Sequence, residues 1–160
     1  MPAIPKPVPA DISTQFKKVL GDLAGSKDSI NNARTWVVSN LEYTQFIVAE
    51  MVKRIRELTQ KQDTEKAGGE RSEWNIGDAK VHVVYLLNDI VFATFKQRQN
   101  PEELDPFASI VKPYLREVFQ LAIRSSGQSD KEKLAKILHY WQSKEVYDAG
   151  FVKILEQVLN

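Results

Sequence analysis

The chain has 160 residues, of which 42% are hydrophobic and 27% charged, and this composition suits one globular domain with a sizeable core. The formal net charge is only +1, which excludes nucleic-acid binding by bulk positive charge and restricts any phosphate recognition to a local cationic patch. Cysteine is absent and histidine occurs twice, so disulfides and thiolate metal sites are excluded and no cofactor is expected.

Residues 1–10 carry four prolines and are expected to form an extended, flexible arm. This segment has no apolar run, so it is not expected to be a signal peptide. No later segment is expected to span a bilayer, because none is long and apolar enough. Residues 11–160 are expected to form one domain.

After the arm, the hydrophobic spacing predicts one helix after another. A first helix is expected to begin at a capping residue, Asp11 or Ser13, and to end by Gly25. A second helix is expected to begin at a cap formed by Ser26 or Asp28.

The middle of the chain predicts a third helix over about 43–58 and a long loop over about 61–77, rich in glycine and charge. Asp78 is then expected to cap a fourth helix that ends near 96–98.

The last part of the chain predicts helices over about 107–125, with Pro113 expected to split that stretch in two. Ser129 is expected to cap the next helix, and residues 147–148 to open a last helix that ends near 159. The prediction is therefore an all-α fold of about eight helices without strands. Short loops between neighbours favour a right-handed superhelix.

The segment 83–91, Val-Val-Tyr-Leu-Leu-Asn-Asp-Ile-Val, is the most informative part of the sequence. Asn88 and Asp89 stand together in an otherwise apolar helix, where both side chains need hydrogen-bond partners. Tyr85, Asn88, Asp89 and Phe92 share one side of this helix. A partner chain that lies across this side would satisfy the two polar groups.

The segment 85–91 resembles the fourth helix of the RNA polymerase II CTD-interacting domain, also called the CID or RPR domain. Its Asn-Asp pair is most similar to the subset in calcium homeostasis endoplasmic reticulum protein and the RPR-domain-containing nuclear regulators. Residues 28–36 resemble the family's second helix, and 133–141, followed by the turn at 146–147, resemble its seventh helix. The order of these motifs agrees over about residues 11–159.

The resemblance implies a fold similar to VHS and ENTH domains and a function in binding, not catalysis. The implied ligand is the phosphorylated heptad-repeat tail of RNA polymerase II, Tyr-Ser-Pro-Thr-Ser-Pro-Ser, with phosphoserine at the second position. The implied role is to couple an RNA-processing factor to transcription in the nucleus. Because a domain that only binds the tail has no activity of its own, we expect the chain to be part of a larger protein.

Such a peptide requires an apolar pocket, hydrogen bonds to its backbone and a cation for its phosphate. By resemblance, Asn88 and Asp89 hydrogen-bond the peptide, and Asp89 accepts from a tyrosine hydroxyl or a backbone N–H. The apolar wall is implied to consist of Tyr85, Ile137 and Tyr140. The phosphate-binding residues are implied to be Lys136, Lys133, Ser26 and Lys27.

Two features depart from the family pattern. Lys136 stands where the family has the arginine that binds a phosphoserine, and lysine cannot form the bidentate contact of a guanidinium. The loop at 61–77 also looks longer than in most relatives.

Simpler interpretations of these residues stay open. Tyr85 is also compatible with a core aromatic, Asn88 with a packing amide, Asp89 with an ion pair to a nearby cation, and Lys136 with a solvated surface lysine. Two tryptophans are expected in the core: Trp36 and Trp141.

Two other binding functions compete with this interpretation. A VHS/ENTH-like adaptor for other peptides or phosphoinositides calls for a basic patch or an amphipathic first helix, but only Lys17 and Lys18 are adjacent there. The second competing function is weak contact with RNA through Lys53, Arg54 and Arg56. No aromatic residues on which bases could stack accompany these cations. An enzyme is not expected, because no nucleophile–base pair, metal-ligand spacing or nucleotide loop is evident.

Overall fold

The computed structural model describes residues 7–68, 75–124 and 127–160. Within these ranges the chain forms α-helices and one short 3₁₀ helix, with no strand. In chain order they are α1 (Ala10–Gly21), α2 (Lys27–Val38), η1 (Leu41–Tyr43), α3 (Thr44–Lys66), α4 (Ile76–Phe95), α5 (Pro106–Ile123), α6 (Gln128–Ser143) and α7 (Ala149–Leu159). The predicted all-α fold is confirmed, with seven α-helices in the described ranges instead of about eight.

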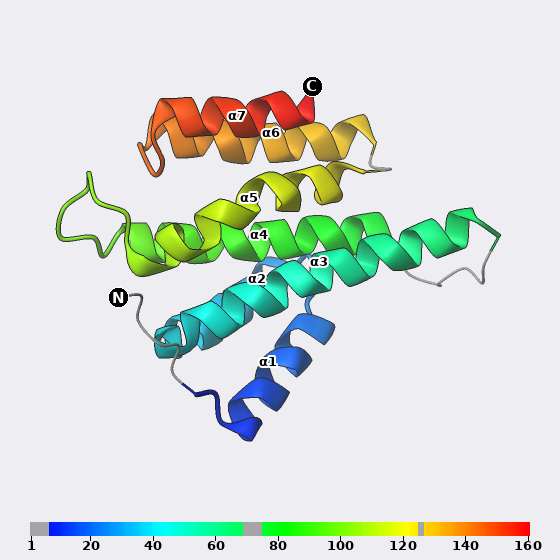
Figure 1. Ribbon diagram of the computed structural model, residues 1–160, viewed down its shortest axis with the longest axis horizontal. Helices are drawn as coiled ribbons and strands as arrows, with labels where there is room; N and C mark the ends of the chain where they lie inside the picture. Colours follow the sequence, from blue (N-terminus) through cyan, green and yellow to red (C-terminus); the bar gives the residue numbers. More distant parts are fainter. Residues whose placement is uncertain (1–6, 69–74, 125–126) are drawn as a thin grey trace.

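Helix α4 is the centre of the structure and packs against α2, α3 and α5. It is apolar on nearly every side, as its buried residues show, and a helix of this kind is stable only when neighbours surround it. Helices α6 and α7 form the layer farthest from α1 (Figure 1). Helices α4 and α6 run in the same direction, and α5 returns the chain between them (Figure 1).

The predicted break at Pro113 is wrong, because α5 continues through it. Proline removes one backbone hydrogen bond, here the bond to the carbonyl of Ser109. Both Pro113 and Ser109 are exposed, so water can satisfy that carbonyl and the helix tolerates the loss. The apolar residues of α5 lie on the opposite face, so the ring lies on the exposed side of the helix.

The loop before α4 is shorter than the predicted 61–77, because α3 extends to Lys66 and α4 begins at Ile76. Most of the remaining loop lies outside the described residues. Asn75, and not the predicted Asp78, caps α4: its side-chain oxygen accepts a hydrogen bond from the Asp78 backbone N–H at 3.0 Å.

The other helix starts agree with the predicted caps only in part. Ser26, one of the two predicted caps, caps α2. Asp148, which lies in the pair expected to open the last helix, caps α7. Helices α1 and α6 have no side-chain cap, so the predicted caps Asp11 or Ser13 and Ser129 are wrong. Acidic residues near these starts lie within the first turn, where a carboxylate also suits the helix dipole.

The predicted arm at 1–10 falls mostly outside the described residues, because residues 1–6 are not described. Residues 7–9 precede α1, and Ala10 already belongs to that helix.

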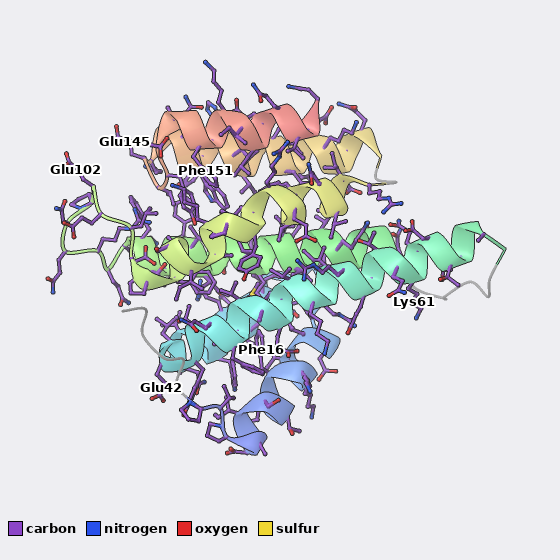
Figure 2. All side chains as sticks on the ribbon, in the orientation of Figure 1. Phe16, Glu42, Lys61, Glu102, Glu145 and Phe151 are labelled. Atoms are coloured by element: carbon purple, nitrogen blue, oxygen red, sulfur yellow. The ribbon has the colours of Figure 1, made fainter. Side chains whose placement is uncertain are left out.

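The core contains one of the two expected tryptophans. Trp141 is completely buried, and its ring meets Phe119 edge to face at a centroid distance of 5.9 Å. Trp36 is only half-buried, stacked on Phe16 at 5.1 Å. Phe16 points from α1 into the bundle and is fully buried (Figure 2). Trp36 therefore closes the edge of the core between α1 and α2.

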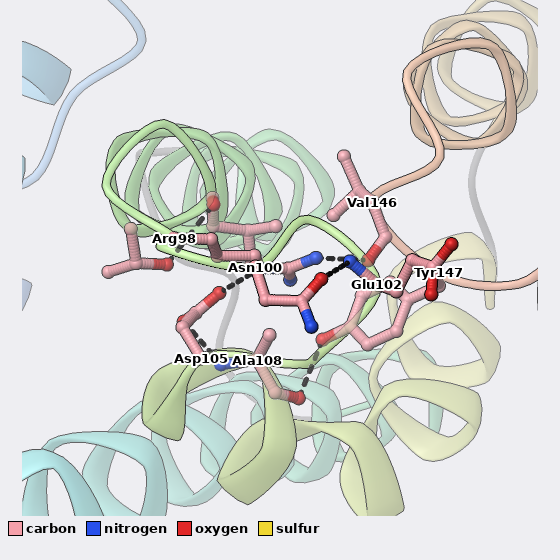
Figure 3. Close-up of polar contacts among 9 residues, drawn as sticks. Arg98, Asn100, Glu102, Asp105, Ala108, Val146 and Tyr147 are labelled. Carbon is pink, nitrogen blue, oxygen red and sulfur yellow. Dashed lines mark hydrogen bonds and ion pairs between the residues drawn. The ribbon is translucent and has the colours of Figure 1, made fainter.

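A buried polar corner joins the α4–α5 loop to the α6–α7 turn (Figure 3). The side chain of Arg98 is 3% exposed, and its Nε donates to Asp105 at 2.7 Å. Arg98 also donates to the backbone carbonyl of Val146 at 3.1 Å, while Asp105 caps α5. The hydroxyl of Tyr147 donates to the Ala108 carbonyl at 2.8 Å, and burial raises the pKa of this tyrosine well above its ordinary value. The corner fixes the carboxyl ends of α4 and α6 relative to each other.

Candidate functional site

A groove of about 710 Å³ crosses α4, with α2 on one side and α6 on the other. This volume is in the range of sites that hold small ligands or short peptide segments. Its lining mixes polar, cationic and aromatic groups: Arg34, Asn88, Asp89, Phe92, Ala93, Lys96, Gln97, Lys136, Ile137 and Tyr140. Five of the residues predicted from sequence therefore lie together: Asn88, Asp89, Lys136, Ile137 and Tyr140.

Asp89 forms an ion pair with Arg34 of α2, with 3.2 Å between Asp89 Oδ2 and Arg34 Nη1. Each of these two side chains is 33% exposed. This contact matches the simpler interpretation of Asp89 as one half of an ion pair. Sequence reasoning did not include Arg34 in the site, although its place in the segment 28–36, two turns beyond Lys27, was an available signal.

Asn88 accepts a hydrogen bond through Oδ1 from the indole N–H of Trp141, at 2.7 Å. The indole nitrogen is only a donor, so it orients the amide: the oxygen faces Trp141 and the NH₂ group points away from it. Asn88 also lines the groove, so its NH₂ group is available to donate to a peptide carbonyl. The packing and binding interpretations of Asn88 are therefore compatible.

The apolar wall of the groove consists of Ile137 and Tyr140 from α6 and Phe92 from α4. The rings of Phe92 and Tyr140 meet edge to face with centroids 4.9 Å apart. Tyr140 is 50% exposed, which is unusual for a large aromatic side chain held by another ring. The contact between the two rings therefore holds an aromatic surface in place at the groove.

Two lysines add positive charge at the groove, Lys136 from α6 and Lys96 at the end of α4. Both are exposed, and neither forms an ion pair with any residue in the described ranges. The two lysines and Arg34 carry three positive charges and Asp89 carries one negative charge, so the groove has a net formal charge of +2. An anionic ligand is therefore favoured there.

The other predicted residues lie nearer the amino end of α4. Gly25 packs so closely on His82 that a Cβ at position 25 would lie 2.5 Å from the imidazole Nε2. This contact places the start of α2, where Ser26 and Lys27 are exposed, beside the first half of α4. Tyr85 is half-buried with its ring 6.4 Å from that of His82, and Lys133 of α6 is exposed. None of these four predicted residues lines the groove itself.

Charged residues of α6 lie close enough to His82 on α4 to influence its pKa. Burial lowers the pKa of His82 and nearby Lys133 lowers it further, while Asp78 and Asp130 act in the opposite direction. Burial, followed by Asp130 and Asp78, raises the pKa of the Tyr85 hydroxyl. Helices α2, α4 and α6 therefore run in the same direction, because their early residues meet here and their later residues meet at the groove.

The cations considered for RNA contact lie elsewhere, on α3. Arg56 forms a bidentate ion pair with Glu117, at 2.8 and 2.6 Å, and Lys53 lies 3.9 Å from Glu57. Arg54 lines a different cavity, next to His82. Carboxylates thus pair with two of the three cations, and contact of this cluster with RNA stays a prediction.

Two kinds of site are absent from the part of the chain that the structure describes. None of its helices combines the length and apolarity needed to cross a membrane. No three histidine, cysteine or acidic side chains are gathered there as a metal site would require.

A groove that offers cations, hydrogen-bonding groups and an aromatic wall suits recognition of a peptide. Comparison with known families agrees: residues 14–155 match the CID domain, and the chain belongs to this family of interaction domains.

Relatives and a solved structure support the assignment. The human protein "Regulation of nuclear pre-mRNA domain-containing protein 1A" is 24% identical over 144 residues, which cover 90% of this chain and 39% of that protein. The human protein 1B of the same name is 24% identical over 141 residues, covering 88% of this chain and 36% of that protein. The CID of Ctk3 has the same fold, with a TM-score of 0.70, 12% identity and 93% of each chain covered. The chain thus spans about two-fifths of the length of these curated relatives.

Proposed function

We propose that this domain binds the C-terminal heptad-repeat tail of RNA polymerase II in its phosphorylated form. In this way it couples an RNA-processing factor to transcription in the nucleus. Membership of the CID family and the likeness to proteins named for the regulation of nuclear pre-mRNA support this function. The single observation that carries it is the groove, which places donors, an acceptor, aromatic surface and cations around one peptide-sized volume.

Each part of the groove has a counterpart in the ligand. The ring of a heptad tyrosine packs against Ile137 and Tyr140, and the NH₂ group of Asn88 donates to a backbone carbonyl. Asp89 accepts from the tyrosine hydroxyl or a backbone N–H through Oδ1, since Oδ2 is engaged by Arg34. Lys136 faces a serine phosphate, which carries a charge of about −2 at neutral pH.

The residues near the amino end of α4 extend this binding surface. Ser26 Oγ accepts from the Ser29 N–H, which leaves its hydroxyl proton to donate to a ligand. Lys27 stands in the first turn of α2, where free backbone N–H groups also favour anions. With Lys133 and Tyr85, these groups form a second contact region for the peptide beyond the groove.

Fluorescence anisotropy with two-repeat tail peptides tests the function. One peptide is unmodified, and the others carry phosphate on the serine at the second, fifth or seventh heptad position. We expect the wild type to bind one phosphorylated form most tightly. We expect Asp89→Ala to weaken all binding and Lys136→Ala to remove the preference for phosphate.

A charge-matched control is Lys153→Gln, which removes an exposed lysine on α7, outside the groove. It should bind every peptide as the wild type does. Absence of binding to all forms at about 1 mM peptide, a free energy of only about −4 kcal/mol, would refute the proposed function. RNA or another peptide would then be tested with the same variants.

A further inference from the structure

Arg34 contributes most of an unused guanidinium to the groove. Its one ion pair, to Asp89, is a single contact through Nη1 at 3.2 Å. A guanidinium has five N–H donors in a rigid plane. No other partner of Arg34 is found among the residues that the structure describes, so four donors are available to a ligand.

Arg34 also lies on the wall opposite Lys136. It comes from α2, whereas Lys136 comes from α6, and both line the same groove. A lysine ammonium is a point charge, but a guanidinium forms two parallel hydrogen bonds with a phosphate. Among the described residues that line the groove, the guanidinium on α2 is the one that can bind a phosphate in this bidentate way.

Asp89 holds the guanidinium of Arg34 in place at the groove. A carboxylate at the floor of the groove would by itself repel a phosphate. Paired with Arg34, it instead holds the guanidinium over the groove through one nitrogen and leaves the remaining donors directed to other partners. The charge of Asp89 is balanced within the pair, so an approaching phosphate meets the two lysines and the free donors of Arg34.

We propose that Arg34 is a specificity-determining residue that binds a phosphate of the peptide ligand bidentately, with Asp89 as its positioning residue. This inference rests on the proposed function, because it assigns one of the phosphate contacts of the same groove. The Arg34 subsite is distinct from the contact at Lys136 on the opposite wall. A peptide with two phosphates, one toward each wall, therefore binds more tightly than a peptide with either phosphate alone.

The binding test uses the peptides described above and adds doubly phosphorylated forms. Arg34→Lys keeps the charge and removes the planar fork, and Lys153→Gln again serves as the charge control. We expect Arg34→Lys to weaken one phosphorylated form about fivefold more than it weakens the unmodified peptide. Equal binding of every phosphorylated form by Arg34→Lys and the wild type overturns the proposal, as does equal weakening of phosphorylated and unmodified peptides.

The variant Asp89→Asn distinguishes two roles of Asp89: orienting the Arg34 guanidinium, or only repelling the phosphate of the ligand. This variant makes the groove more positive, so a purely repulsive Asp89 predicts tighter binding of phosphate. A positioning Asp89 predicts a smaller phosphate preference, because Arg34 loses the carboxylate that orients it. Tighter binding of the phosphorylated forms by Asp89→Asn overturns the positioning role.

A second measurement distinguishes failure of this inference from failure of the proposed function. The ¹⁵N–¹H signal of Arg34 Nε, assigned by its loss in Arg34→Lys, is followed by NMR during titration with O-phosphoserine. A shift of this signal supports the phosphate site even if no tail peptide binds, in which case only the proposed function fails. An unmoved signal, whether or not the peptides bind, overturns the inference.

Discussion

The indole Nε1 of Trp141 donates to Asn88 Oδ1 over 2.7 Å and so links the fully buried core of α6 to the floor of the groove on α4. Asn88 has one side in the core and the other in the groove. The same hydrogen bond therefore ties this side chain to the core and fixes the orientation of its NH₂ group.

We expect Asn88→Ala to lower the free energy of unfolding by about 1–3 kcal/mol, because it leaves the buried Trp141 N–H without an acceptor. Denaturant unfolding measures this loss. In a Trp141→Phe background, which has no indole N–H, the same change should cost clearly less. If the two costs agree within about 0.3 kcal/mol, the hydrogen bond does not contribute as described.

We expect Lys136→Arg to strengthen the preference for a phosphorylated tail peptide, because it adds a second fork facing Arg34 across the groove. The exposed side chain at this position has little effect on folding, so the melting temperature should stay unchanged. Anisotropy with matched phosphorylated and unmodified peptides is the measurement. An unchanged ratio of the two dissociation constants would show that Lys136 does not face the phosphate.

We expect the stability of the domain to fall as the pH drops below about 6.5, partly through His82. The folded state lowers the pKa of His82 from its ordinary value of 6.5, chiefly by burial. The unfolded chain therefore binds the additional proton more readily, and acid favours unfolding. His82→Gln should flatten this part of the curve of unfolding free energy against pH. An equal slope in both proteins would contradict the assignment, and the exposed His139→Gln is the matched control.

We expect Arg98→Ala to destabilise the domain by about 3 kcal/mol or more, because it leaves the buried carboxylate of Asp105 and the Val146 carbonyl without their partner. Arg116→Ala removes an exposed arginine of α5 and should change the unfolding free energy by less than about 0.5 kcal/mol. Chemical denaturation of both variants makes the comparison. A similar small cost for both would mean that the corner is not a structural link.

Local sequence signals predicted the helical elements well where they agreed with each other. The expected start at residues 147–148 and the end near 159 agree with α7, and the segment 83–91 lies in the most buried helix. Sequence spacing also placed Lys136, Ile137 and Tyr140 on one face of α6, and the structure brings this face to Asn88 and Asp89. Whether these residues bind the ligand as proposed is for the peptide experiments to decide.

The features that the sequence did not predict depend on neighbours distant in the chain. The unbroken course of α5 through Pro113 is an exception, because the apolar spacing already places this residue opposite the buried face. Arg34 enters the site only because α2 lies beside α4, which brings residues 55 positions apart to 3.2 Å. Helix caps were uncertain for a different reason, since the same acidic residues suit either the cap or the first turn.

The common direction of α2, α4 and α6 gives the surface around the groove two unlike ends. All three helix amino termini, with their partial positive charge, lie toward one end, and the negative carboxyl termini lie toward the other. Because these ends differ in charge, we expect the surface to favour one N-to-C direction of a bound peptide over the other. On a tail of identical repeats, every bound copy of the domain would therefore have the same orientation. Any protein segment joined to the domain would then project from the same side of each repeat.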